Sequence, residues 1–165
     1  MGWGRSRKPA EGPQPTAYQR ALGLLVRREH SRKELGRKLV AKGVDREDLD
    51  LALEKLRRQD FQNDTRFAAA LARSRSSSGY GPARIRAELA QHGLSRDDVA
   101  QALEACETDW DAAARQLVER RYGGKDLGDP ATRRKAVDFL IRRGFEQRSA
   151  YAAASTRPGD DEAFD

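Results

Sequence analysis

Residues 31–49 read SRKELGRKLVAKGVDREDL, and this stretch decides the fold because its pattern returns at residues 81–99 as GPARIRAELAQHGLSRDDV. The two copies are 50 residues apart and match at Leu35 and Ile85, Leu39 and Leu89, Gly43 and Gly93, and Val44 and Leu94. A weaker third copy follows at an offset of 51 residues, as Ala136, Leu140, Gly144 and Phe145. Such a period indicates stacked supersecondary units that each lack enough core to stand alone.

Apolar residues recur at helical spacing through these copies, as in Leu49, Leu53 and Leu56, and no alternating run of strand length is present. We expect helices over residues 17–28, 32–42, 46–58, 64–76, 82–92, 96–106, 109–122, 130–143 and 146–154. The sequence therefore predicts an all-α protein of three tandem three-helix repeats in an elongated, curved array.

Local signals mark the helix ends. The predicted N-caps are Thr16, Ser31, Asp45, Ser95 and Asp129, and Thr16 and Ser31 are each followed three residues later by the Gln or Glu of a capping box. Gly43, Gly93 and Gly144 each end a helical pattern and precede one apolar residue, which predicts left-handed C-caps. These signals divide the chain into repeats over residues 16–60, 61–107 and 108–155, with a basic tail over 1–15 and an acidic tail over 156–165, both expected to be disordered.

The formal net charge of +6 is unevenly distributed. Residues 1–60 contain 15 Lys/Arg and 9 Asp/Glu, whereas residues 61–165 contain 17 of each. A polyanion or an acidic protein surface is the expected partner of the first third, and a merely solvated basic face is the other interpretation. The basic N-terminus is followed by no apolar segment and no run of about 18 apolar residues occurs, so we expect a cytoplasmic protein with no membrane partner.

The residues that usually carry chemistry are sparse. One cysteine, Cys106, and two histidines, His30 and His92 in different repeats, cannot form a structural zinc site, and we expect both histidines to be exposed at helix ends. No Gly-x-Ser-x-Gly elbow is present, and Gly123-Gly124-Lys125 matches a phosphate loop only in part. We therefore expect a non-enzymatic protein with no cofactor, no metal and no small-molecule substrate.

The candidate binding surface is cationic. Lys33 and Arg37 lie on the helix face opposite Leu35 and Leu39 and should point to solvent. Arginine forks bind phosphate or carboxylate in a bidentate manner, and a tyrosine ring can stack on a base. The candidates for contact with a partner protein or DNA are Arg27, Arg28, Lys33, Arg37, Lys38, Arg75, Tyr80, Arg84, Arg86 and Arg121.

A family resemblance rests on several of these stretches. The segment from Gly79-Tyr80-Gly81-Pro82 to Gly93-Leu94 resembles the central motif of RecX proteins, and Asp64-Thr65-Arg66-Phe67 before it is similar as well. His30 to Gly43 resembles the opening motif of the family, and the closing pattern is similar to Asp109-Trp110, Arg121-Tyr122-Gly123, Phe139-Leu140 and Arg143-Gly144-Phe145. The resemblance covers about residues 17–154.

This resemblance implies a function that composition does not reveal. RecX proteins are three repeats of three helices that bind the RecA–DNA filament in its groove and restrain its growth, its recombination activity in DNA repair and its SOS co-protease activity. The resemblance therefore implies a regulator, mainly an inhibitor, of RecA. The alternative is a stand-alone helical nucleic-acid-binding protein, which the charge excess of residues 1–60 would favour.

Overall fold

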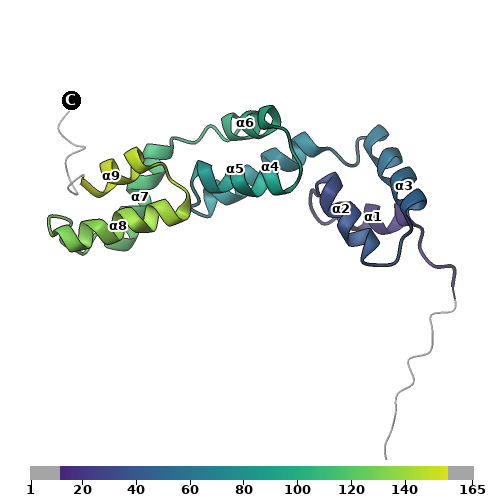
Figure 1. Ribbon diagram of the computed structural model, residues 1–165, viewed down its shortest axis with the longest axis horizontal. Coiled ribbons are helices and arrows are strands. Elements are labelled where there is room, and N and C mark those ends of the chain that lie inside the picture. Colours follow the sequence, from purple (N-terminus) through teal and green to yellow (C-terminus); the bar gives the residue numbers. More distant parts are fainter. Residues whose placement is uncertain (1–11, 156–165) are drawn as a thin grey trace, which may run out of the picture.

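The computed structural model describes residues 12–155, which form nine helices and no strand (Figure 1). The helices are α1 (Ala17–Leu25), α2 (Arg32–Val40), α3 (Arg46–Arg58), α4 (Asp64–Ser77), α5 (Pro82–Gln91), α6 (Arg96–Glu104), α7 (Trp110–Tyr122), α8 (Pro130–Arg143) and α9 (Gln147–Ser155). The all-α prediction is confirmed. The tails expected before residue 12 and after residue 155 lie outside the described residues.

The helices form three units that follow one another along the molecule in a shallow arch (Figure 1). Within each unit, α1–α3, α4–α6 and α7–α9, the helices pack on each other. Each unit has its own cluster of buried apolar side chains, centred on Leu35 and Leu56, on Ile85 and Leu89, and on Ala136 and Leu140. The indole of Trp110 packs against both the second and the third cluster. No helix within residues 12–155 is long and apolar enough to cross a membrane.

Several helices end earlier than their apolar pattern suggests. α1 ends at Leu25 rather than near residue 28, because the amide of Arg27 bonds the carbonyl of Leu24 in a tightened last turn. α6 ends at Glu104 for the same reason, since the Cys106 amide bonds the Leu103 carbonyl. Apolar periodicity continues through such turns, so it places the body of a helix better than its end.

The predicted left-handed conformation occurs at all three glycines, although only Gly144 is itself the C-cap residue and Gly43 and Gly93 follow the caps of α2 and α5. Gly43, Gly93 and Gly144 have φ values of 81°, 77° and 90°. The amides of Val44 and Phe145 then bond the carbonyl oxygens five residues earlier, at 3.2 and 3.1 Å, which is the long bond of a Schellman motif. The apolar residues after the glycines return to the cores of their units.

The second helices of successive units meet end to end. At the second joint, the amide of Gly81 donates to the carbonyl oxygen of Arg143 at 2.8 Å, and the amide of Ala83 donates to that of Gly144 at 3.0 Å. The carbonyl end of α8 thus caps α5, whose N-cap Gly81 makes no side-chain bond. A β-carbon on Gly81 would lie 2.4 Å from the Gly144 backbone, so only glycine permits this approach.

The first joint has the same arrangement with different chemistry. The N-cap Ser31 of α2 meets His92, the C-cap residue of α5, with 2.8 Å between Oγ and Nδ1. The Asp64 carboxylate accepts the amide of Arg32 at 2.8 Å, so a side chain serves the free amides of this helix end. Side chains therefore make the first joint, where backbone groups make the second.

Candidate functional site

A charged groove crosses the first joint. Three adjoining depressions of about 480 to 540 Å³ share Glu88 in their walls and continue from α2 across His92 to the start of α5. We call this feature the joint groove. Its charged and titratable lining residues are Arg28, Glu29, Lys33, Glu34, Arg37, Arg75, Arg84, Glu88 and His92, and Tyr80 lies in the wall near Arg84.

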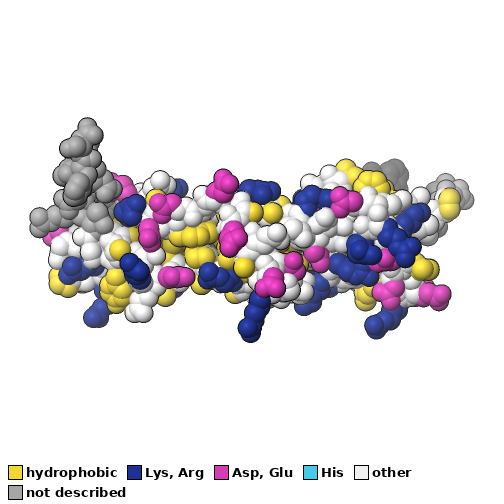
Figure 2. Space-filling view, turned by 90° about the horizontal axis from the view of Figure 1, so that it is seen from above, with side chains coloured by type: hydrophobic (Ala, Val, Ile, Leu, Met, Phe, Trp, Pro, Cys, Tyr) yellow, Lys and Arg dark blue, Asp and Glu magenta, His cyan; other side chains and the backbone are white. Residues whose placement is uncertain are grey.

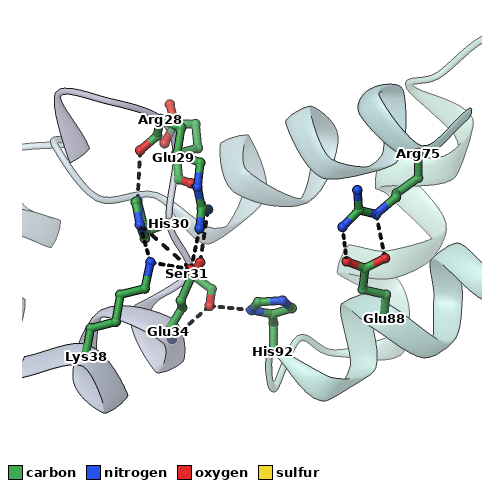
Figure 3. A network of polar contacts seen from close by, with 9 residues as sticks. All are labelled: Arg28, Glu29, His30, Ser31, Glu34, Lys38, Arg75, Glu88 and His92. Atoms are coloured by element: carbon green, nitrogen blue, oxygen red, sulfur yellow. Dashed lines mark hydrogen bonds and ion pairs between the residues drawn. The ribbon is translucent and has the colours of Figure 1, made fainter. Parts of the chain in front are cut away.

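A buried carboxylate organises one end of the groove (Figure 3). The Glu34 side chain is 7% exposed and receives hydrogen bonds from Arg28 Nη2 at 2.5 Å and Lys38 Nζ at 2.8 Å. Burial alone would raise the pKa of Glu34, but the hydrogen bonds from Arg28 and Lys38 outweigh it and lower the pKa to about 2. Glu34 therefore stays ionised and fixes the side chains of Arg28 and Lys38, two of the predicted contact residues.

Glu34 does not complete the capping box predicted for α2. Its amide bonds Ser31 Oγ at 3.0 Å, as expected, but its carboxylate turns to Arg28 and Lys38 instead of the N-cap amide. The prediction is wrong for this half of the motif. Two charge-assisted hydrogen bonds are stronger than one bond to a neutral amide, which explains the choice.

The expectation that both histidines are exposed is wrong, because His30 is buried and His92 is half-buried. His30 is 2% exposed; its Nδ1 donates to the Arg28 carbonyl at 3.0 Å, so the neutral ring accepts from Lys38 through Nε2, also at 3.0 Å. Ser31 Oγ accepts from the Glu34 amide, so its hydroxyl donates to His92 Nδ1. Burial lowers the pKa of both histidines, which keeps this hydrogen-bonded chain neutral near pH 7.

The charges in the middle of the groove are partly neutralised. Arg75 forms a fork of hydrogen bonds to Glu88 at 2.8 and 2.6 Å, and these bonds lower the pKa of Glu88 (Figure 3). Glu29 accepts one hydrogen bond from Arg66 Nε at 2.5 Å. Among the residues that the structure describes, three groove cations form no ion pair with Asp or Glu, namely Lys33, Arg37 and Arg84, although the charge of Arg84 helps to lower the pKa of Glu88. All three are exposed and available to an anionic ligand.

The structure thus brings together candidates that are about 50 residues apart in the chain. Arg28, Lys33 and Arg37 of the first unit share the groove with Arg75 and Arg84 of the second. Glu34, Glu88 and the two histidines were not among the predicted site residues. The only sequence signal for them is helical spacing: Glu34 lies four residues before Lys38, and Glu88 lies four residues before His92.

The remaining candidates lie outside the groove or carry a different role. Arg27 is exposed at the end of α1, and Arg86 lies 4.0 Å from Glu146. Tyr80 is half-buried, and the guanidinium groups of Arg84 and Arg143 lie 4.9 and 5.0 Å from the centroid of its ring. Arg121 lies over the ring of Phe139 in the third unit. Within residues 12–155, no group of three or more His, Cys, Asp or Glu side chains could hold a metal ion.

Family models match all three units in order. The first three-helix domain of RecX matches residues 17–56, the second matches residues 63–103 and the third matches residues 107–153. These segments contain the nine helices that the structure shows between residues 12 and 155, apart from a few terminal residues.

Curated relatives extend the similarity over most of the chain. Regulatory protein RecX of Xanthomonas axonopodis pv. citri (strain 306) is 54% identical over 138 residues, which cover 84% of this chain and 85% of the relative. Regulatory protein RecX of Stenotrophomonas maltophilia (strain R551-3) is 50% identical over 157 residues, covering 95% and 94%.

Solved structures show the same fold. A crystal structure of regulatory protein RecX superposes with a TM-score of 0.68 at 25% identity, covering 85% of this chain and 70% of the other. The crystal structure of RecX from Lactobacillus salivarius gives a TM-score of 0.68 at 22% identity, covering 83% and 91%. With three domain models in register and relatives at half identity or better, the chain belongs to the RecX family, the non-enzymatic regulatory proteins of the RecA recombinase.

Proposed function

We propose that this RecA regulator acts on the RecA–DNA filament in the cytoplasm, and that the joint groove is its main contact surface. The observation that supports the proposal is the presence in one groove across two repeats of Lys33, Arg37 and Arg84, three exposed cations that form no ion pair within residues 12–155. Regulation by this contact is mainly inhibitory: it restrains filament growth and with it recombination, DNA repair and SOS co-protease activity.

The elongated shape supports a filament over a single protomer as the target. Three units of three helices follow one another along the length of the molecule (Figure 1). A filament repeats its own surface in the same way, so a second contact forms at a high effective concentration once the first has formed. Cations of the groove pair with acidic side chains of the filament or with DNA phosphates inside it.

Binding of naked nucleic acid is the alternative function, and the excess of 6 positive charges in residues 1–60 favours it. The groove argues against it, because Glu29, Glu34 and Glu88 lie among the cations and would repel a continuous line of phosphates. Under the proposed function, binding to naked single-stranded DNA is weak. Tight binding with a steep dependence on salt would support the alternative instead.

The test reverses the charge of the groove. In the double variant Lys33→Glu with Arg37→Glu, affinity for RecA filaments assembled on single-stranded DNA should fall at least about tenfold, because repulsion replaces pairing at the interface. Free RecA and naked DNA are measured in parallel. The matched control is Lys42→Glu with Arg46→Glu, which changes the net charge equally at two exposed positions of the same repeat outside the groove.

The control separates local contact from total charge. Melting temperatures of both variants should remain close to wild type, since Lys33 and Arg37 make no ion pair that stabilises the fold. Equal losses of filament binding in the two variants would show that overall charge, and not the groove, determines affinity. Wild-type inhibition of RecA by the groove variant would remove the groove from the proposal.

A further inference from the structure

Arginine and aromatic side chains alternate across the second joint. The Arg121 guanidinium lies 4.8 Å from the centroid of the Phe139 ring, and that of Arg143 lies 5.3 Å from the same ring. Arg143 also lies 5.0 Å from the Tyr80 ring, whose centroid is 4.9 Å from the Arg84 guanidinium. We call this row Arg121–Phe139–Arg143–Tyr80–Arg84 the arginine ladder; it begins on α7, passes through α8 and ends on α5.

The ladder holds three guanidinium groups in place without neutralising them. Within residues 12–155, none of Arg84, Arg121 and Arg143 forms an ion pair with Asp or Glu. Arg143 is also anchored by a bond from Nη1 to the Ser78 carbonyl oxygen at 3.2 Å. An arginine that rests on a ring loses less rotamer freedom on binding, and its outward fork remains free for a ligand.

We propose that the arginine ladder is a docking surface for an acidic segment of a partner protein, with one carboxylate at each arginine. This inference rests on the proposed function and deepens it, because it assigns to the same regulator a second contact, on repeats two and three, which shares Arg84 with the joint groove. A guanidinium fork matches the two oxygens of a carboxylate, and the contact gains strength where the arginine is already oriented.

The surroundings favour a protein over a nucleic acid. Residues 61–155 carry 16 Lys/Arg and 13 Asp/Glu, and Figure 2 shows cationic and acidic side chains interspersed along the visible face. A nucleic acid requires a continuous basic stripe or free aromatic faces. The Tyr80 ring is half-buried and already contacts the guanidinium groups of Arg84 and Arg143, and Phe139 is 8% exposed. Separate carboxylates can be accommodated between the acidic side chains, whereas a line of phosphates cannot.

The test replaces the ladder arginines by lysine, which keeps the positive charge and removes the guanidinium fork. The triple variant Arg84→Lys, Arg121→Lys and Arg143→Lys retains three positive charges, yet lysine has no planar fork with which to bind a carboxylate in a bidentate manner. The matched control replaces Arg96, Arg120 and Arg148, three exposed arginines of the same two repeats that make no ring contact or ion pair, by lysine. A double variant, Arg84→Lys with Arg121→Lys, leaves the Arg143 bond to Ser78 intact in case the joint is weakened.

The probe is a short fluorescein-labelled peptide of alternating Glu and Ala residues, titrated against full-length protein by anisotropy. Wild type and control should bind it alike, and the ladder variants should bind about tenfold more weakly at an unchanged melting temperature. Equal affinity of ladder variant and control, or no binding by wild type, would overturn the proposal. A loss confined to an oligothymidylate probe would identify phosphate as the ligand and overturn it too.

Filament binding is measured on the same samples, so that failure of the ladder inference can be distinguished from failure of the proposed function. If wild type binds RecA filaments and the ladder variants bind the peptide normally, the ladder inference is wrong and the proposed function stands. If wild type binds the acidic peptide through the ladder but does not bind filaments, the proposed function fails and the docking surface stands.

Discussion

At the scale of single residues, Glu34 shows how a charge can be both buried and stabilising. Its carboxylate is enclosed at the first joint, where burial by itself opposes ionisation. Arg28 and Lys38 each donate a hydrogen bond to it, and the pKa of Glu34 falls to about 2 from an ordinary value of 4.5. Because the pKa is lower in the folded protein, ionised Glu34 stabilises the fold above pH 4.5. That stabilisation is lost as the pH falls towards 2.

Replacement of Glu34 by Gln should lower the free energy of unfolding by about 3 kcal/mol at pH 7, since Arg28 and Lys38 lose their counter-charge in a buried site. The difference from wild type should shrink as the pH falls from 4.5 towards 2. Urea denaturation at a series of pH values measures it. Glu54→Gln is the control, because Glu54 has a similarly low pKa of about 2 but its side chain is 35% exposed, against 7% for Glu34. A pH-independent loss would show that Glu34 acts through packing alone.

At the scale of helices, the same C-cap glycine has different consequences in different repeats. Gly43 and Gly144 share a positive φ, at 81° and 90°. A β-carbon on Gly43 would meet no atom within 4 Å, whereas one on Gly144 would lie 2.5 Å from the β-carbon of Arg84 and 2.6 Å from its amide nitrogen. Gly43 therefore serves only its own helix, while Gly144 also allows α8 to meet α5.

The substitution Gly43→Ala should cost about 1 kcal/mol, the usual penalty for a side chain at positive φ. The substitution Gly144→Ala should cost about 3 kcal/mol or more, because the joint must also open. Chemical denaturation compares the two variants directly. Equal costs would mean that the contact between α8 and α5 contributes nothing to stability.

At the scale of the whole molecule, the separate cores make stability local. The buried clusters of the first and third units share no residue, and each unit contacts only its neighbour, through the joints at helix ends and a few side chains such as Trp110. In a linear array of this kind, each unit has its own stability and a coupling only to its neighbour. A defect in the first unit should therefore be felt in the second and hardly at all in the third.

Leu35→Ala removes a fully buried side chain from the first core and should destabilise that unit by about 2–5 kcal/mol. Amide hydrogen exchange should become faster over α1–α3 and stay near wild type over α7–α9. The reciprocal variant Leu140→Ala should give the opposite pattern, since Leu140 is equally buried in the third unit. Uniform acceleration in either variant would show that the three units unfold as one.

The amino-acid sequence by itself determined the elements of this protein. Helix positions and glycine caps depend on interactions between residues three to five positions apart, so they can be predicted from local sequence. The repeat of 50 residues is a recurrence of these local patterns. The family motifs lie on the same local segments, such as Gly79-Tyr80-Gly81-Pro82. The solvent-facing direction of Lys33 and Arg37 also followed from helical spacing alone, and both side chains are exposed.

The tertiary structure alone decided which of these residues meet. Ser31 bonds His92 and Gly81 receives the end of α8, although each pair is about 60 residues apart. These joints cover His30 and partly cover His92, and they place Arg143 beside the Tyr80 ring. No local sequence pattern predicts these contacts. The physical reason is that the free amides and carbonyls at a helix end need hydrogen-bond partners. The sequence does not reveal which distant group provides them. That choice sets which cations remain free, and so what the surface can bind.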